Sequence, residues 1–382
     1  MRFRLIVLSV LTAAAGMALP GLTAPSLAAG TCSGWRIVPS PKIGNENQGH
    51  FYGVSALSTS NAWAVGNGYL NGYYRTRAEH WNGTAWSIKA TPNVGTNDLE
   101  QLESVAAISS NNVWAVGYSQ LFSSYSTILM HWNGMKWKLV ASPDPGTDNR
   151  LYGIAALSSK NLWAVGSTDG NMLILHYNGS TWSRVTVANR VGDTQDHLLA
   201  VARVPGTGQL WAVGEGFGGS GWVTLALRYS GGHWSVVASQ DRGTTPQLDG
   251  VAAISPTNAW AVGYDYGASG SEALAEHWNG TAWSIKSTPN LAKSDLRAIV
   301  ALSSRNLWAV GTYKPTTSTR QKTLVLHRNA TTFSKVSSPN PTKSDNSFYG
   351  VARVPRRANL WAVGVSAPPA SVDHPLVEKY CP

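Results

Sequence analysis

The segment Asn61-Ala-Trp-Ala-Val-Gly66 contains the tetrapeptide that decides the fold, because Trp-Ala-Val-Gly occurs seven times in the 382-residue chain. Consecutive copies are 48 to 53 residues apart, with their tryptophans at Trp63, Trp114, Trp163, Trp211, Trp260, Trp308 and Trp361. A period near 50 residues is typical of propeller blades rather than of helical solenoids. The sequence therefore predicts seven similar units.

Each repeat contains four short segments rich in β-branched or aromatic residues, which favour strands. In the first repeat we expect strands at 53–57, 61–66, 77–81 and 84–89, called strands a, b, c and d below. Asn82 and Gly83 stand between strands c and d, and Asn-Gly favours a two-residue hairpin turn. Four antiparallel strands in each of seven repeats predict an all-β fold, a seven-bladed β-propeller.

The two ends of the chain complement each other in this pattern. The last repeat ends at 376–380, which aligns with strand c, and no strand d follows it. Residues 34–39 align with strand d. We therefore expect the propeller to span 29–382, with blade 7 formed by 347–381 plus 31–41, so that the N-terminal strand completes the last blade and closes the ring.

The only two cysteines lie at these two ends. If Tyr380 aligns with Trp81, and Trp35 with Trp86, then Cys381 and Cys32 take adjacent positions in the hairpin between strands c and d. The sequence therefore predicts a disulfide between Cys32 and Cys381, which an exported protein retains.

Residues 1–28 have the features of a secretory signal peptide. Arg2 and Arg4 precede an apolar stretch, and Ser26-Leu27-Ala28 is a small-x-small cleavage site. Export to the extracellular space is therefore expected, with no membrane span after signal removal. The formal net charge falls from +10 to +8 without Arg2 and Arg4, and the remaining basic residues do not cluster. This distribution indicates solubility rather than nucleic-acid binding, and we expect a monomer.

Loop lengths distinguish two faces of the predicted ring. The a–b and c–d turns are nearly constant in length, whereas the b–c and d–a connections vary and are expected to carry the binding function. On that side, the residue directly before each strand a differs in chemistry from blade to blade. The residues that follow it are nearly the same in all seven blades. We expect this position to surround the mouth of the central channel and to bind a polar ligand through Tyr52, Glu103, Tyr152, Asp249, Arg297 and Tyr349, with Leu199 in the fourth blade. An alternative is that these are ordinary rim residues of a water-filled channel.

Two further groups are candidates for ligand binding. Arg203 and Arg353 replace an alanine of the other five blades in strand a, and their guanidinium groups are expected to project into the channel and hold an anion, unless their stems only fill space. Tyr74, Tyr125 and Trp222 lie in the b–c loops, where they either form a sugar-stacking platform or pack the loops.

The sequence indicates no cofactor, no metal centre and no catalytic residue that spacing alone can identify. Five histidines occupy one repeat position in separate blades and so cannot converge on one metal: His80, His131, His176, His277 and His327. The d–a connections do carry acidic residues, so the sequence leaves open whether a cation binds there.

Three motifs together, Asn-x-Trp-Ala-Val-Gly, His-Trp-Asn-Gly-Thr-x-Trp-Ser and Ser/Thr-Pro-Asn, resemble repeats of secreted bacterial propellers of largely unassigned function. Trp-Ala-Val-Gly also resembles propellers of the photosystem II assembly-factor type. The hairpin from Gly83 to Trp86 is similar to the end of the sialidase Asp-box, but Trp81 stands where that box has its aspartate. Kelch-like galactose oxidases would imply copper and a Tyr–Cys crosslink, and the double glycine of kelch strands is missing here.

Three functional hypotheses follow. The first is an exported binding protein for a glycan or another polar extracellular ligand, on the long-loop face and at the channel mouth. The second is a polysaccharide hydrolase or lyase that uses acids such as Glu103 and Asp249. The third is a protein–protein interaction scaffold.

Overall fold

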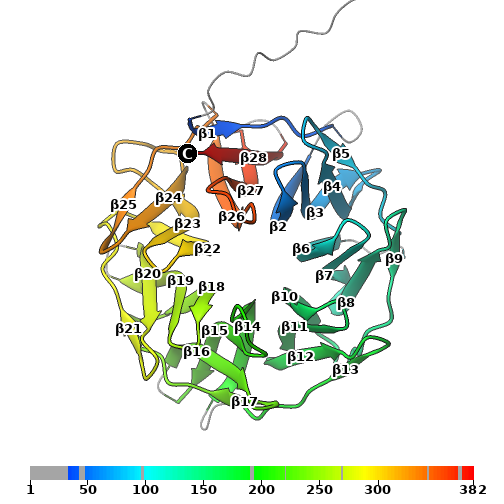
Figure 1. Cartoon of the computed structure of the whole chain (residues 1–382), viewed down its shortest axis with the longest axis horizontal. Helices are drawn as coiled ribbons and strands as arrows, with labels where there is room; N and C mark the ends of the chain where they lie inside the picture. The colour runs from blue at the N-terminus through cyan, green and yellow to red at the C-terminus, as the bar shows by residue number, and fades with distance from the viewer. Residues whose placement is uncertain are drawn as a thin grey trace, which may run out of the picture. The chain divides into compact units, whose positions relative to one another are not determined.

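The computed structural model describes residues 33–42, 48–95, 99–189, 193–219, 221–267, 270–341, 344–368 and 372–382. These residues form 28 strands and no helix. The strands group into seven blades of four antiparallel strands arranged around a central axis, and one parallel pairing, Tyr74 with Leu99, links the first two blades into one sheet (Figure 1). The prediction of an all-β, seven-bladed propeller is confirmed. Residues 1–28, assigned above to a signal peptide, lie outside the described ranges.

The first four blades follow the order of the chain. Blade 1 consists of β2 (Gly49–Ser58), β3 (Asn61–Leu70), β4 (Tyr73–Trp81) and β5 (Trp86–Ile88). Blade 2 consists of β6 (Leu99–Ser109), β7 (Asn112–Leu121), β8 (Ser124–Trp132) and β9 (Trp137–Leu139). Blade 3 consists of β10 (Asn149–Ser158), β11 (Asn161–Thr168), β12 (Asn171–Tyr177) and β13 (Trp182–Arg184). Blade 4 consists of β14 (Asp193–Arg203), β15 (Leu210–Gly218), β16 (Gly221–Ser230) and β17 (His233–Val236).

The last three blades bring the chain back to its start. Blade 5 consists of β18 (Gln247–Ser255), β19 (Asn258–Gly267), β20 (Gly270–Trp278) and β21 (Trp283–Ile285). Blade 6 consists of β22 (Ser294–Ser303), β23 (Asn306–Tyr313), β24 (Lys322–Asn329) and β25 (Thr332–Lys335). Blade 7 consists of β26 (Asp345–Arg353), β27 (Leu360–Ala367), β28 (His374–Cys381) and β1 (Gly34–Ile37).

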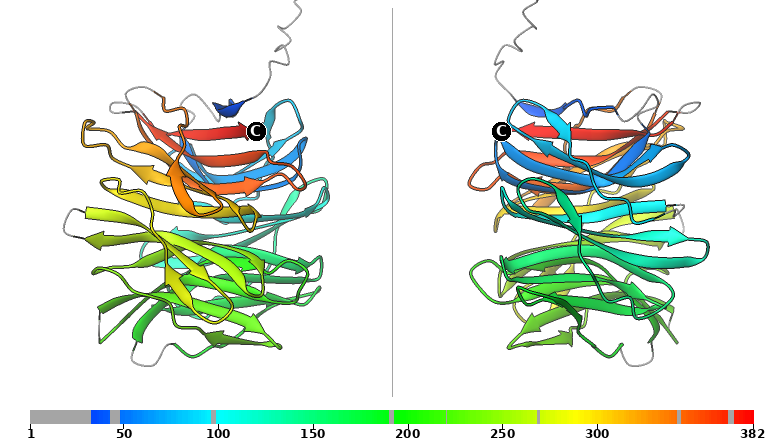
Figure 2. Two further views of the ribbon diagram at one scale, coloured as in Figure 1. Left: turned by 60° about the vertical axis from the view of Figure 1, so that its left-hand side comes forward. Right: turned by 90° about the vertical axis from the view of Figure 1, so that its right-hand side faces the viewer.

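The N-terminal strand β1 is the outermost strand of blade 7. Trp35 pairs with Tyr380, as Trp86 pairs with Trp81 in blade 1, so the predicted alignment of the two ends is confirmed. Figures 1 and 2 show β1 beside β28 at the rim of the ring. The inner strands of blades 7 and 1 also share a buried apolar cluster that includes Phe51 and Trp361. The ring is therefore closed by packing between blades 7 and 1, while β1 completes blade 7.

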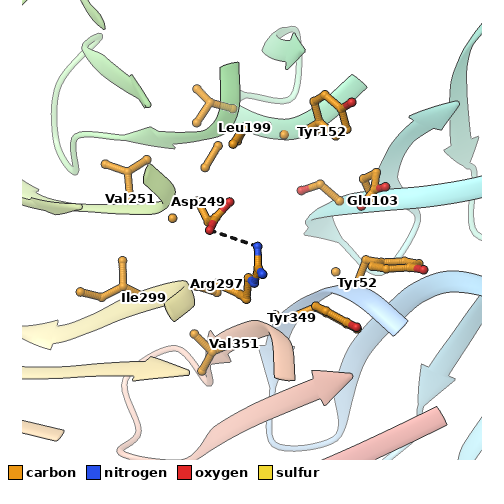
Figure 3. Close-up of a pocket in the computed structure, with 18 of the residues that line it drawn as sticks. Tyr52, Glu103, Tyr152, Leu199, Asp249, Val251, Arg297, Ile299, Tyr349 and Val351 are labelled. Atoms are coloured by element: carbon orange, nitrogen blue, oxygen red, sulfur yellow. Dashed lines mark hydrogen bonds and ion pairs between the residues drawn. The ribbon is translucent and has the colours of Figure 1, made fainter. Parts of the chain in front are cut away.

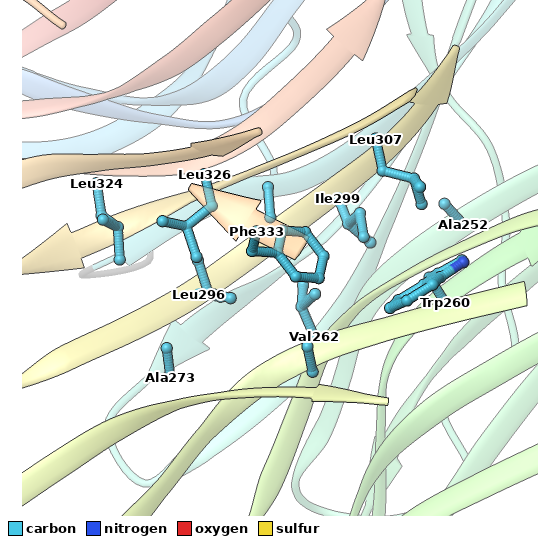
Figure 4. Packing of buried hydrophobic residues seen from close by; sticks show 12 residues of the cluster. Ala252, Trp260, Val262, Ala273, Leu296, Ile299, Leu307, Leu324, Leu326 and Phe333 are labelled. Carbon is cyan, nitrogen blue, oxygen red and sulfur yellow. The ribbon is translucent and has the colours of Figure 1, made fainter. Parts of the chain in front are cut away.

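The repeated tryptophans form the core between blades. Seven buried clusters lie at the seven interfaces between neighbouring blades. Figure 4 shows the cluster between blades 5 and 6, where Trp260 and Phe333 pack with their ring centroids 5.7 Å apart. Each buried tryptophan removes roughly 150–250 Å² of surface from water. The ring is therefore rigid, and its side chains of variable chemistry lie on a constant framework.

The recurring histidines belong to this framework. In each of the five blades that carry one, the histidine Nε2 lies 3.0 or 3.1 Å from the Oδ1 of the asparagine that opens strand b, as His80 does from Asn61. The ring of the same histidine also packs on the tryptophan of Trp-Ala-Val-Gly. These contacts give the five histidines a role in the packing of each blade.

Two expectations about turns are wrong. Four residues, not two, lie between Trp81 and Trp86, and the Asn82 Oδ1 accepts hydrogen bonds from the backbone N–H groups of Thr84 and Ala85. The asparagine therefore acts through its side chain rather than through a two-residue turn. The b–c loop of blade 1 is also mostly strand, because β3 and β4 stay paired out to Leu70 and Tyr73.

Within the described ranges, no helix has the length and apolar character that a membrane crossing requires.

Candidate functional site

The predicted ring position is a β-bulge in every blade. In β2, Phe51 pairs with Gly66 and Gly53 pairs with Val65, so Tyr52 between them has no partner across the ladder. The same register shift leaves out the corresponding residue of the other six inner strands: Glu103, Tyr152, Leu199, Asp249, Arg297 and Tyr349. A bulge redirects the side chain of its extra residue and is frequent beside functional sites.

The glycine of Trp-Ala-Val-Gly makes room for this bulge. A Cβ at Gly66 would overlap the carbonyl oxygen of His50, two residues before Tyr52. The same clash would occur in the other six blades, for example between Gly263 and the carbonyl of Gln247. The repeated glycine is therefore required by the close approach of the two inner strands. The glycine of the repeat motif and the bulge on the facing strand therefore occur together in every blade.

The seven bulge residues meet at one cavity. Their side chains line a space of about 170 Å³ in the central channel, which we place at its upper end, the end of the b–c and d–a connections. Figure 3 shows these side chains together with residues of the next level, such as Val251 and Ile299. Tyr349, Tyr52, Glu103 and Tyr152 come from the consecutive blades 7, 1, 2 and 3. Leu199, Asp249 and Arg297 come from blades 4, 5 and 6. The structure thus brings together all six polar side chains predicted for this position. We call the space the ring cavity.

One side of the ring cavity holds a charged network. The Arg297 guanidinium lies 3.3 Å from Asp249 and 3.3 Å from Asp295, and 4.8 Å from the centre of the Tyr264 ring. The amide of Gln247 donates to Asp249 at 2.5 Å. Burial raises the pKa of Asp249 to about 6, although Arg297 acts to lower it. The positive charge of Arg297 is therefore shared by two carboxylates within the protein.

The other side of the ring cavity combines one carboxyl with tyrosines. Burial raises the pKa of Glu103 to about 7, even though hydrogen bonds from Gln101 and Tyr118 favour its ionised form. Burial also raises the pKa of Tyr52 well above its usual value, and the nearby Glu103 adds to that effect. The rings of Tyr52 and Tyr349 lie 5.3 Å apart. Glu103 therefore changes protonation near neutral pH among phenols that stay neutral.

A second layer of polar residues supports the ring, and sequence reasoning missed most of it. In blades 1, 2, 5 and 6 the residue two positions before the bulge contacts the bulge side chain, as His50 Nδ1 contacts the Tyr52 hydroxyl at 2.9 Å. These residues also face the residue that follows Trp-Ala-Val-Gly in strand b, as Asn67 faces His50 and Tyr264 faces Gln247. The residue after the motif varies between blades much as the ring position does. This variation is the sequence signal that could have identified the second layer.

A level of Val and Ile side chains separates the ring cavity from the lower channel. Val251 and Ile299, each two residues after its ring residue, lie next to the ring residues at the floor of the ring cavity and also line a second cavity below it. This apolar level follows from the uniform Val or Ile of strand a. Polar groups above it are therefore held apart from those below it.

Arg203 and Arg353 lie in that second cavity and not in the ring cavity. They close β14 and β26, four residues after Leu199 and Tyr349. Four strand residues span about 13 Å, so both arginines lie at the opposite end of the channel. The structure brings the two arginines together, as predicted, but on the side of the a–b turns instead of the long-loop side. The two arginines therefore do not line the ring cavity with the other predicted ligand-binding residues.

The aromatic residues of the b–c hairpins do not line the ring cavity. Tyr74 accepts a hydrogen bond from Gln48 at 2.8 Å, and Trp222 packs on Phe217 with their ring centroids 5.1 Å apart. Arg150 lies 3.6 Å above the centre of the Tyr125 ring. These three aromatic residues are spread over blades 1, 2 and 4 and pack with their own hairpins or neighbouring loops.

The predicted disulfide falls partly on residues that are not described. Cys381 ends β28 and pairs with Gly34 in β1. Its proposed partner Cys32 lies outside the described ranges, two residues before Gly34. The disulfide therefore stays a prediction.

Comparison with known proteins relates this chain to others through its fold. No family model and no curated protein sequence matches it. Among solved structures, it is similar to YCF48 bound to a D1 peptide, with 13% identity, a TM-score of 0.56, and coverage of 92% of this chain and 98% of that one. YCF48 from Cyanidioschyzon merolae gives 14% identity, a TM-score of 0.54 and coverage of 91% and 99%.

A second kind of relative in these comparisons is an enzyme. The ulvan lyase of polysaccharide lyase family PL25, bound to -[GlcA(1-4)Rha3S]-, gives 10% identity, a TM-score of 0.55, and coverage of 90% of this chain and 94% of that one. At such identities the similarity concerns the fold alone. The chain is a β-propeller distantly similar in structure to the YCF48 assembly factor and to this lyase.

Proposed function

We propose that this chain is an exported binding protein that holds one group of a polar, hydroxyl-rich extracellular ligand, such as a glycan, in the ring cavity. The observation that carries this proposal is the convergence of seven bulge side chains on one cavity, six of them polar. A bulge in every blade aims a side chain at the same space, so the ligand contacts can differ at each position without changing the ring.

The size of the ring cavity supports capture of a single group. Its volume of about 170 Å³ is smaller than the roughly 300–1,000 Å³ typical of sites that enclose a drug-sized ligand. One sugar ring or the end of a chain enters, and the rest of the ligand lies over the loops around the mouth. The signal-like residues 1–28 support delivery of the protein to an extracellular ligand.

A glycan array on the mature protein, followed by calorimetry on the best ligand, tests this proposal. Tyr52→Ala and Glu103→Gln are expected to weaken binding about tenfold or more, because each removes a polar contact in the cavity. Leu199→Ala is the matched control from the same ring position. Binding that survives both substitutions would show that the ligand lies elsewhere.

A second candidate is a polysaccharide hydrolase or lyase. The observation that favours it is the presence of two carboxyls in one cavity whose pKa values are raised, Glu103 to about 7 and Asp249 to about 6. Such values suit proton transfer near neutral pH. Incubation of each bound glycan with the protein, with Glu103→Gln as control, distinguishes the two functions. New reducing ends indicate hydrolysis and unsaturated products indicate elimination.

The third hypothesis, a protein–protein scaffold, predicts a different outcome. The YCF48 structure has a bound peptide, and this chain shares that fold. Under the scaffold hypothesis, no glycan binds, and substitutions in the ring cavity change the capture of a protein partner instead.

A further inference from the structure

The lower end of the channel contains the larger of the two cavities. Its volume is about 450 Å³, within the roughly 300–1,000 Å³ usual for small-molecule sites, whereas the ring cavity measures about 170 Å³. Its walls are mostly Ala, Val, Ile and Leu side chains of β14, β18 and β22. Arg203 and Arg353 are the only charged residues among those that line it. We call this space the lower cavity.

Each of the two arginines stands directly before a backbone turn, and the two turns match. We call each of these turns a corner. Each arginine ends its strand and is followed by a fully buried valine and a proline, in the sequence Arg-Val-Pro. The N–H of Val204 donates to the carbonyl of Gln209 at 2.9 Å, and the N–H of Val354 donates to that of Asn359 at the same distance. Because each valine anchors its corner in the interblade core, the arginine before it leaves the backbone from a fixed place.

The charge of these arginines is not neutralised within the described ranges. Neither guanidinium lies within 4.0 Å of a described carboxylate, in contrast to Arg297 of the ring cavity, which has two such partners. The Arg353 Nη1 donates to the carbonyl of Ala301 at 3.2 Å, and both side chains are exposed. A guanidinium has five N–H donors, so most of them remain for a ligand.

The other blades show that these arginines are not needed to build the ring. The same position in strand a is alanine in the remaining five blades: Ala56, Ala107, Ala156, Ala253 and Ala301. Blades 4 and 7 therefore place two positive charges where the repeat otherwise has a methyl group. A structural role alone gives no reason for two charges in a cavity of apolar walls.

From this geometry we propose that the lower cavity is a second binding site, for a small organic acid whose carboxylate or sulfonate contacts Arg203 and Arg353 while its apolar body lies against the alanine and valine walls. Guanidinium groups bind such oxyanions through paired N–H···O bonds. The site is separate from the ring cavity and does not rest on the function proposed for that cavity.

Calorimetry on the mature protein tests this proposal with three probes of one shape, naphthoate, naphthylmethanol and naphthylmethylammonium. We expect naphthoate to bind with one molecule per chain, roughly tenfold or more tightly than the alcohol, because only the anion forms charge-assisted hydrogen bonds. The ammonium probe should bind least. The double variant Arg203→Ala/Arg353→Ala should lose roughly tenfold or more of the naphthoate affinity.

Two controls keep the result interpretable. Arg357→Ala removes an exposed arginine that follows the blade 7 corner and does not line the lower cavity, so it should leave binding unchanged. The double variant should keep its melting temperature, because alanine is the residue of five other blades. Equal affinity for the acid and the alcohol, no binding of naphthoate, or an unchanged affinity in the double variant would each overturn the proposal. Loss of naphthoate binding in Tyr52→Ala would also overturn it, since it would place the acid in the ring cavity.

Discussion

The guanidinium of Arg297 and the carboxylate of Asp249 come from neighbouring blades and lie 3.3 Å apart inside the ring cavity. Only 11% of the Asp249 side chain and 30% of the Arg297 side chain are exposed. Asp295 approaches the same guanidinium from the strand of Arg297 itself. Two blades are thus joined by an ion pair at the ring position, in addition to their shared apolar core.

Removal of the shared cation should destabilise the ring. We expect Arg297→Met to lower the free energy of unfolding by about 1–3 kcal/mol, because two largely buried carboxyls lose their counter-ion. The pKa of Asp249 should also rise further above its value of about 6. Guanidinium chloride unfolding measures the first effect. The double variant Asp249→Asn/Arg297→Met should lose less than the sum of the single variants, and simple additivity would rule out the coupling.

Replacement of the motif glycine should be costly wherever a bulge needs it. We expect Gly263→Ala to lower the free energy of unfolding by about 1–3 kcal/mol, since its Cβ would overlap the carbonyl oxygen of Gln247. Gly208→Ala is the matched control, because a Cβ there meets no atom within 4 Å. Thermal unfolding of both variants is the measurement, and equal melting temperatures would contradict the role given to the motif glycine.

Two buried carboxyls should each contribute stability that falls as pH rises. Burial raises the pKa of Glu276 and of Glu378 to about 8 from the ordinary value of 4.5. Between about pH 5 and pH 8 the unfolded chain releases protons that the folded chain keeps, so the free energy of unfolding decreases with pH, by up to about 1.4 kcal/mol per pH unit for each group. This contribution is complete below the pKa of the unfolded chain and is lost as pH rises through the folded pKa.

Glu378→Gln tests this dependence directly. The Glu378 side chain is fully buried, and neither of its carboxyl oxygens has a hydrogen-bond partner among the described residues. The variant keeps the shape of the side chain and removes its titration, so from pH 5 to pH 8 its melting temperature should fall less, or rise more, than that of the wild type. Glu272→Gln, at an exposed position of β20, should keep the wild-type dependence. The same dependence of melting temperature on pH in Glu378→Gln and in the wild type would contradict the assignment.

The predicted disulfide should contribute to the closure of blade 7. If Cys32 and Cys381 are bonded, reduction or Cys381→Ser should lower the free energy of unfolding by about 2–4 kcal/mol, because β1 has only four residues and joins its blade through β28 alone. Mass spectrometry after alkylation under native and reducing conditions is the measurement. Alkylation of both thiols in the native, unreduced protein would show that no bond forms.

Repetition made the ring predictable from sequence. Seven copies of one tetrapeptide defined the blade count, and the pairing of Trp35 with Tyr380 followed from aligning the two chain ends with a complete blade. The ring position was found because Tyr52 and its counterparts vary within a constant framework. Such comparison works because each blade repeats the same geometry and only the side chain changes.

Backbone register accounts for what sequence comparison did not provide. The bulge at Tyr52 shifts the alternation of strand a by one residue, and no pattern of side chains in the sequence marks that shift except the glycine opposite. The placement of Arg203 below the Val and Ile level depends on the length of its strand. In blade 1, the residues expected to form the b–c loop continue as paired strands to Leu70. These features depend on hydrogen-bond pairing, which composition and spacing describe poorly.

A side chain that stands outside the ladder can be exchanged without loss of a ladder hydrogen bond. The bulge in every blade therefore gives this scaffold seven contact points directed at one space, and all but the ion-paired Asp249 and Arg297 can be exchanged independently. A library randomised at the other five positions, with Asp249, Arg297, the glycines and the tryptophans kept, should retain a folded ring while its ligand preference is selected anew.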